Sequence, residues 1–266
     1  MIMKYIDVHC HIFPSAIAGK VIDALETFYG YHWQGTGALD DLLRSIRKAG
    51  INKSVIFSSA TKPAQVPAIN QFIHTLQSQY PELFIGFGTM HPEYPHFREE
   101  IAKMCDLGLN GFKFHPDFQQ FCIDDERMLP VYEEAEKRNM TLLFHIGDYR
   151  TPYSKPERLK RIHKMFPSLK LIAAHMGGYS EWEQAWQHLI GEEIYLDVSS
   201  TMFSLSPQEV RKMVQAHGID KVLFASDYPA VHHRKAVEDV LRMGFSREDN
   251  EKIFYKNAEK LLNITL

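Results

Sequence analysis

Short apolar segments alternate with longer amphipathic segments along the whole chain of 266 residues. The short segments are rich in β-branched and aromatic residues and stop at glycine, proline or polar residues, which is typical of buried strands. This pattern predicts eight strands, at residues 5–11, 54–59, 84–90, 111–115, 141–147, 170–178, 194–199 and 222–227.

The segments between the strands carry apolar residues at helical spacing. Leu39, Leu42, Leu43 and Ile46 have the spacing i, i+3, i+4, i+7 of one helix face, and Gly50 follows as a stop signal. The same reasoning predicts helices at residues 16–28, 39–49, 66–80, 97–107, 127–138, 156–166, 182–190, 207–217, 237–243 and 249–262.

Strands that are buried on both faces and alternate with helices form parallel sheets. Eight such units in about 250 residues match the (β/α)8 barrel. A doubly wound open sheet is the alternative, but no Gly-x-Gly-x-x-Gly or P-loop motif follows any strand. No linker, low-complexity tract or longer repeat interrupts the alternation. We therefore expect an α/β protein in which residues 1–266 form a single domain, one TIM barrel.

The composition, 45% hydrophobic and 24% charged, is that of an ordinary globular protein. The formal net charge of −3 gives no basic patch for nucleic acid. The three cysteines are too few and too scattered for a disulfide framework. No apolar run reaches the roughly 18 residues of a membrane span, and no secretory signal is present. We expect a cytoplasmic protein with a small-molecule substrate and no nucleic-acid or membrane partner; a homo-oligomer is one alternative for its assembly.

Histidines and one aspartate occur where the predicted strands end. His9 and His11 lie two residues apart on the first strand and point to the same face, whereas Cys10 points to the opposite face. Imidazoles on one face, with Cα atoms about 6–7 Å apart, can bind a single metal ion. Later strands end at or near further candidates, namely His91, His115, His145, His175 and Asp227. The carboxyl ends of barrel strands form the active-site face, so we expect these side chains to gather there.

Neutral imidazole and carboxylate are the usual ligands of zinc and similar divalent ions, and an open coordination position makes such a site catalytic. The ion lowers the pKa of bound water to near 7. A carboxylate beside that water can accept its proton, and a nearby histidine can polarise the substrate or deliver a proton. Asp227 suits the first role and His175 suits the second.

Several short motifs, in this order along the chain, resemble those of the amidohydrolase superfamily. They are Asp-Val-His-Cys-His (7–11), Gly-Phe-Lys-Phe-His-Pro (111–116), Phe-His-Ile-Gly (144–147), Ala-His-Met-Gly-Gly (174–178), Ala-Ser-Asp-Tyr-Pro (225–229) and Asn-Ala-Glu-Lys-Leu-Leu (257–262). They are most similar to its amidohydrolase-related branch, which also contains aminocarboxymuconate-semialdehyde and resorcylate decarboxylases. The resemblance implies one divalent metal ion, expected to be zinc, bound by His9, His11, His145 and Asp227, with His175 as a catalytic residue.

The resemblance leaves two residues of the fourth strand open. Binuclear members of the superfamily carry a carboxylated lysine on this strand, and Lys113 is a lysine there. Because His115 lies further along on the same face, we expect Lys113 to sit deeper in the barrel as a buried, hydrogen-bonded lysine. We expect His115 to contact substrate rather than metal.

The expected reaction is hydrolysis of an amide, ester or lactone bond in a small molecule. The alternative is non-oxidative decarboxylation at the same metal site. A third hypothesis is a barrel that binds a metal or ligand without catalysis. The decarboxylase relatives use an arginine from a loop, and this chain has no arginine between the second strand and His91. Side chains after the fifth strand, Tyr149, Arg150 and Tyr153, could also reach a substrate. We expect His163, His188 and His217 on helix surfaces. We expect His232 and His233 in solvent, with a place in the pocket lining as the alternative.

Overall fold

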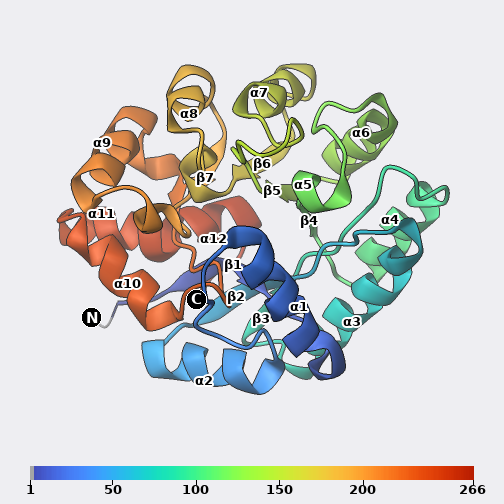
Figure 1. The fold of residues 1–266 in the computed structure, drawn as a ribbon, viewed down its shortest axis with the longest axis horizontal. Coiled ribbons are helices and arrows are strands. Elements are labelled where there is room, and N and C mark those ends of the chain that lie inside the picture. The colour runs from blue at the N-terminus through green and yellow to red at the C-terminus, as the bar shows by residue number, and fades with distance from the viewer. Residues whose placement is uncertain (1–2) are drawn as a thin grey trace.

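Eight parallel strands form the centre of the computed structural model, which describes residues 3–266 (Figure 1). Their bounds are β1 Ile6–His11, β2 Lys53–Phe57, β3 Phe84–Gly86, β4 Gly111–Phe114, β5 Thr141–Phe144, β6 Lys170–Ala173, β7 Tyr195–Asp197 and β8 Val222–Leu223. Most strands end earlier than the apolar pattern predicts. The clearest case is β6, which ends at Ala173 although the pattern predicts a strand to residue 178. The residues beyond each ladder form loops, and these loops carry most of the polar side chains described below.

The strands pair as two parallel sheets, β1–β2–β3 and β4 to β8 in sequence order. Gly88 forms a bridge with Phe112, where the Gly88 amide donates to the Gly111 carbonyl at 2.9 Å. On the other side Cys10 forms a bridge with Tyr228, and the His11 amide donates to the Tyr228 carbonyl at 2.7 Å. These contacts join the two sheets to each other at both edges, so the predicted barrel is confirmed.

Helices surround the strands as a ring, and α1 lies in front of the barrel in Figure 1. They are α1 Ser15–Tyr29, α2 Leu39–Ala49, α3 Val66–Gln79, α4 Phe97–Asp106, α5 Pro116–Gln119, α6 Leu129–Lys137, α7 Pro156–Met165, α8 Trp182–His188, α9 Pro207–His217, α10 His233–Arg242, α11 Arg247–Glu251 and α12 Asn257–Leu262. The sequence pattern misses α5 and starts α10 four residues late. A π-helical turn, Lys252–Lys256, divides the predicted last helix.

Apolar side chains form two buried layers. The smaller cluster takes residues from several strands, including Val8, Phe57, Leu143 and Ile172, and fills the centre of the barrel. The larger cluster lies between the strands and the helices, so the barrel is packed on both sides. Within residues 3–266 we find no helix with the length and apolar character that crossing a membrane requires.

Candidate active site

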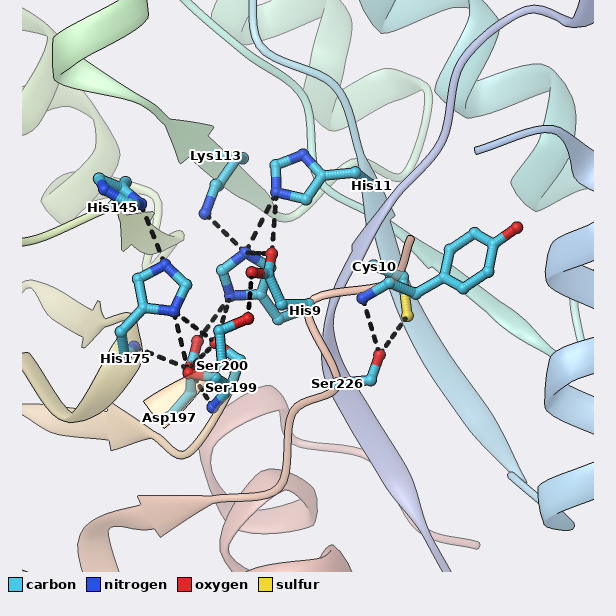
Figure 2. A network of polar contacts seen from close by, with 12 residues as sticks. His9, Cys10, His11, Lys113, His145, His175, Asp197, Ser199, Ser200 and Ser226 are labelled. Carbon is cyan, nitrogen blue, oxygen red and sulfur yellow. Dashed lines mark hydrogen bonds and ion pairs between the residues drawn. The ribbon is translucent and has the colours of Figure 1, made fainter. Parts of the chain in front are cut away.

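The imidazoles of His9 and His11 lie close together (Figure 2). They meet the carboxylate of Asp227 where β1 and the segment after β8 lie side by side. The Nε2 atoms of His9 and His11 are 3.2 Å apart. Asp227 Oδ1 lies 3.2 Å from His9 Nε2 and 3.5 Å from His11 Nε2. The three ligand atoms lie within 4.8 Å of one another and form one of the groups that could hold a metal ion.

The local backbone brings these side chains together. A register shift between Asp7 and Cys10 interrupts the pairing of β1 with β2. Asp7 Oδ1 accepts hydrogen bonds from the backbone amides of His9 at 2.9 Å and Ser226 at 3.1 Å, and this connects β1 with the segment after β8. Asp227 has a φ of 60°, a left-handed conformation that is uncommon for aspartate. Ser200 donates a 2.6 Å hydrogen bond to Asp227 Oδ2 and fixes the second carboxylate oxygen.

Asp197, at the end of β7, orients His9. Its Oδ2 lies 2.8 Å from His9 Nδ1, and both side chains are fully buried. Burial opposes ionisation of Asp197, but the adjacent His9 and Ser199 lower its pKa to about 2. Burial and Lys113 oppose protonation of His9, yet Asp197 and Asp227 raise its pKa above the usual value. The two carboxylates therefore favour a positive charge between them.

His145 and His175 form a second pair beside this group. His145 Nδ1 lies 3.0 Å from His175 Nε2, and His175 Nδ1 lies 3.0 Å from the Ser199 carbonyl oxygen. His145 does not belong to the close group of His9, His11 and Asp227. Its buried Nε2 has no hydrogen-bond partner among the described residues and lies 3.9 Å from Asp117 Oδ2. Burial lowers the pKa of both imidazoles, so both are neutral with lone pairs available.

His115 lies at the wall beside His145. The two rings stack with centroids 4.1 Å apart and planes 11° apart. His115 Nε2 is 2.9 Å from the hydroxyl of Tyr29, the last residue of α1. Burial lowers the pKa of His115 well below its usual value, so the ring is neutral.

Lys113 lies deeper than His115, as the spacing on β4 predicts. It is fully buried, and its Nζ is 3.0 Å from His9 Nε2. Burial lowers its pKa to about 7. Lys113 does not line the cavity described next, whereas His115 does.

A cavity of about 450 Å³ opens above these groups. His11, His115, His145, His175 and Asp227 contribute to its lining. Most of the remaining wall is apolar or aromatic, and α1 supplies one side of it. The aromatic residues of the wall are Phe13, Phe28, Tyr29, Tyr31, Trp33, Phe118 and Tyr179. This shape and chemistry suit a small planar ligand whose polar end reaches the histidines.

Of the three side chains after β5 that could reach a substrate, none lines the cavity. Arg150 instead connects the loop after β5 to the end of α1 through hydrogen bonds. Its Nε donates to Asp148 Oδ1 at 2.8 Å and its Nη1 to the Phe28 carbonyl at 2.6 Å. The guanidinium also lies 4.1 Å from the centroid of the Phe28 ring. Arg150 therefore holds part of the cavity wall in place.

The structure places three histidines differently from our predictions. His91 does not line the cavity; its Nδ1 accepts the Glu93 amide at 3.2 Å. His217 is buried, because its Nε2 donates to the Ile194 carbonyl at 2.8 Å where α9 meets the segment before β7. His233 is fully buried, because α10 begins there and packs it against Ser45 of α2, with 2.7 Å between Nδ1 and Oγ.

Sequence reasoning missed the contribution of β7 and α1. Asp197 is the last residue of β7 and contacts His9. Ser199 and Ser200, which follow it, contact His175 and Asp227 respectively. The run Asp-Val-Ser-Ser was a usable signal, because polar residues at the end of a barrel strand face the active site. Nothing in the sequence pattern indicates that α1 forms the cavity wall.

Comparisons with known proteins find a matching family and a curated relative. The model of a family described as amidohydrolase matches residues 6–264. A curated 2-amino-3-carboxymuconate-6-semialdehyde decarboxylase from Dictyostelium discoideum is 27% identical over 150 residues, 47% of this chain and only 42% of that protein's length.

Solved structures resemble the chain over almost its full length. An uncharacterized TIM-barrel protein from Bordetella bronchiseptica has a TM-score of 0.77 at 18% identity, covering 98% of this chain and 99% of the other. A dihydroxybenzoic acid decarboxylase from Polaromonas sp., solved with manganese and the inhibitor 2-nitroresorcinol, has a TM-score of 0.74 at 18% identity, covering 98% of this chain and 97% of the other. At these identities the likeness shows the fold.

Proposed function

The chain belongs to the amidohydrolase family, and from this premise we propose that it is a metal-dependent decarboxylase of a small aromatic or unsaturated carboxylic acid. The observation that carries the proposal is the cavity, whose lining combines aromatic side chains with His11, His175 and Asp227. Such walls suit a planar ring or conjugated chain with its carboxylate directed at the histidines. The relative and the neighbour named as decarboxylases support the same reaction.

The residues of the site fit a divalent metal ion. Ligand atoms about 2.1 Å from one tetrahedral ion are about 3.4 Å apart. The atoms of His9, His11 and Asp227 are separated by 3.2–3.5 Å. We propose these three as ligands and His145, whose neutral ring follows the end of β5, as the fourth. We propose zinc as the ion, with manganese as the alternative suggested by the Polaromonas decarboxylase.

A bound divalent ion would position the substrate carboxylate and stabilise negative charge that develops in the reaction. The chain itself supplies orientation and a proton. The Ser199 carbonyl oxygen can only accept, so Nδ1 of His175 carries a hydrogen and Nε2 is the atom that exchanges a proton. When the bond between the carboxyl and the ring or chain carbon breaks, CO2 leaves and the electron pair remains on that carbon. The neutral Nε2 of His175 takes up a proton from solvent and delivers it to that carbon, so one carboxylate and one proton give CO2 and the protonated product.

We therefore propose decarboxylation rather than hydrolysis, although the sequence alone favours hydrolysis. That preference depends on the missing arginine between β2 and His91. Hydrolysis stays the second candidate, because Asp227 lines the cavity and could accept a proton from water.

A screen of small acids tests the proposed function. The metal-loaded protein is incubated with hydroxylated benzoic acids and conjugated dienoic acids, and CO2 release is measured. We expect at least one acid to release CO2 stoichiometrically, and protein stripped of metal by a chelator to be inactive until the ion is restored. Turnover of amides, esters or lactones, without CO2 release from any acid, would contradict the proposal.

Replacing Asp197 with asparagine is expected to weaken metal binding about ten- to hundredfold, because the carboxylate that orients His9 Nδ1 and makes the ring a stronger ligand is lost. The measurement is the dissociation constant of the ion by competition with a coloured chelator. Asp220→Asn removes an exposed carboxylate that pairs with Lys252 and should leave the constant unchanged. Equal constants for wild type and Asp197→Asn would contradict this role.

A further inference from the structure

The wall of the cavity contains one cation that the proposed reaction does not use. Among the described residues, Lys20 is the only lysine or arginine in the lining. It is an exposed residue of α1, so it lies where the cavity opens to solvent. Lys20, Ala24 and Phe28 are spaced at i, i+4 and i+8 and form one stripe of α1 along the cavity.

Lys20 has no ion-pair partner within residues 3–266, although Asp23 and Glu26 are on the same helix. Glu26 is engaged elsewhere, because it contacts His32 at 3.0 Å and accepts the Trp33 amide at 2.8 Å. The ammonium group is therefore free to meet an anion in the cavity.

The other charged and polar groups of the lining show what that anion would be. Apart from its histidines, the lining contains two charged residues, Asp227 and Lys20. Asp227 belongs to the proposed metal site, which takes the reacting carboxylate. Lys20 is left for a second anionic group.

The cavity has room for such a ligand. From Lys20 to Phe28 the helix rises about 12 Å, at 1.5 Å per residue. A volume of about 450 Å³ exceeds the need of a single benzoate ring and falls within the range of sites for larger ligands. Ser59 also lines the cavity, and its buried hydroxyl has no hydrogen-bond partner among the described residues.

We propose that Lys20 selects a dicarboxylic acid: one carboxylate is bound at the metal end, and the second, at the far end of a planar ring or conjugated chain, pairs with Lys20. This inference rests on the proposed function for the metal end alone. It names the substrate class as aromatic or unsaturated dicarboxylates.

Binding of two unreactive acids tests the proposal without relying on turnover. Benzoate and benzene-1,4-dicarboxylate are titrated calorimetrically into the metal-loaded protein. We expect the dicarboxylate to bind at least about fivefold more tightly, which is about 1 kcal/mol at 1.4 kcal/mol per tenfold. Lys20→Gln should abolish this preference and leave the benzoate affinity unchanged, whereas Lys20→Arg should retain it. Lys48→Gln, at an exposed lysine of α2, is the matched control and should behave as wild type.

An unchanged preference in Lys20→Gln would overturn the proposal, and so would a wild type that binds neither acid or binds both equally. Failure of this proposal can be distinguished from failure of the proposed function. If the preference depends on Lys20 but no acid releases CO2, the assignment of Lys20 stands and the decarboxylase proposal fails.

Discussion

Replacing His11 with alanine is expected to remove most of the divalent ion from the purified protein, and with it most of the activity. His11 Nε2 lies 3.2 Å from His9 Nε2 and 3.5 Å from Asp227 Oδ1. Its loss therefore removes one of the proposed metal ligands, on the side that faces the cavity. Burial lowers the pKa of His11 to about 3, so the ring is a neutral ligand across the whole working pH range. The side chain is 13% exposed, and its removal should leave the barrel folded.

Elemental analysis provides the measurement, with about one ion per chain expected in the wild type. His96→Ala removes an exposed histidine before α4 and should retain the ion. Full occupancy in His11→Ala would contradict the proposed site. Two ions per chain in the wild type, bridged through a carboxylated Lys113, would contradict the mononuclear assignment.

Replacing Asp227 with asparagine is expected to lower turnover by about three orders of magnitude or more, as removal of groups that act directly at a catalytic centre does. Burial opposes ionisation of Asp227, but His9 and His11 hold its pKa well below the usual value, so the site contains a permanent anion. Asparagine keeps the shape and removes that charge. It also tolerates the left-handed backbone at this position, where φ is 60°, so the variant should fold.

The effect of Asp227→Asn is measured as kcat with saturating divalent ion, together with the circular dichroism spectrum and the melting temperature. Asp106→Asn changes an exposed aspartate at the end of α4 and should keep the wild-type rate. A folded Asp227→Asn enzyme with more than a tenth of the wild-type rate would show that this carboxylate does not act at the reacting centre.

The barrel and the core of the candidate site follow from local patterns. The alternation of apolar and amphipathic segments specifies the eight strands, and barrel geometry brings their carboxyl ends together. This is why the sequence alone could group His9, His11 and Asp227, although β1 and the segment after β8 are more than 200 residues apart. The roles of these residues and of His145, His175 and His115 remain predictions.

Features that depend on packing between helices and loops could not be predicted in this way. His217 and His233 have surface-like positions in the sequence but are buried, since α9 and α10 present them to neighbouring segments. The placement of α1 at the cavity is a tertiary property that its own periodicity does not encode. The aromatic wall on which we base the decarboxylase proposal, including Tyr29 and Trp33, is therefore visible only in three dimensions.

The fate of solvent isotopes tests the central claim most directly. An acid that the metal-loaded protein consumes is converted once in deuterated water and once in water enriched in 18O. Our account predicts one CO2 per acid consumed, one solvent deuterium on the carbon that carried the carboxylate, and no 18O in the organic product. A product carboxylate that contains 18O, formed without CO2, would contradict the account and establish hydrolysis.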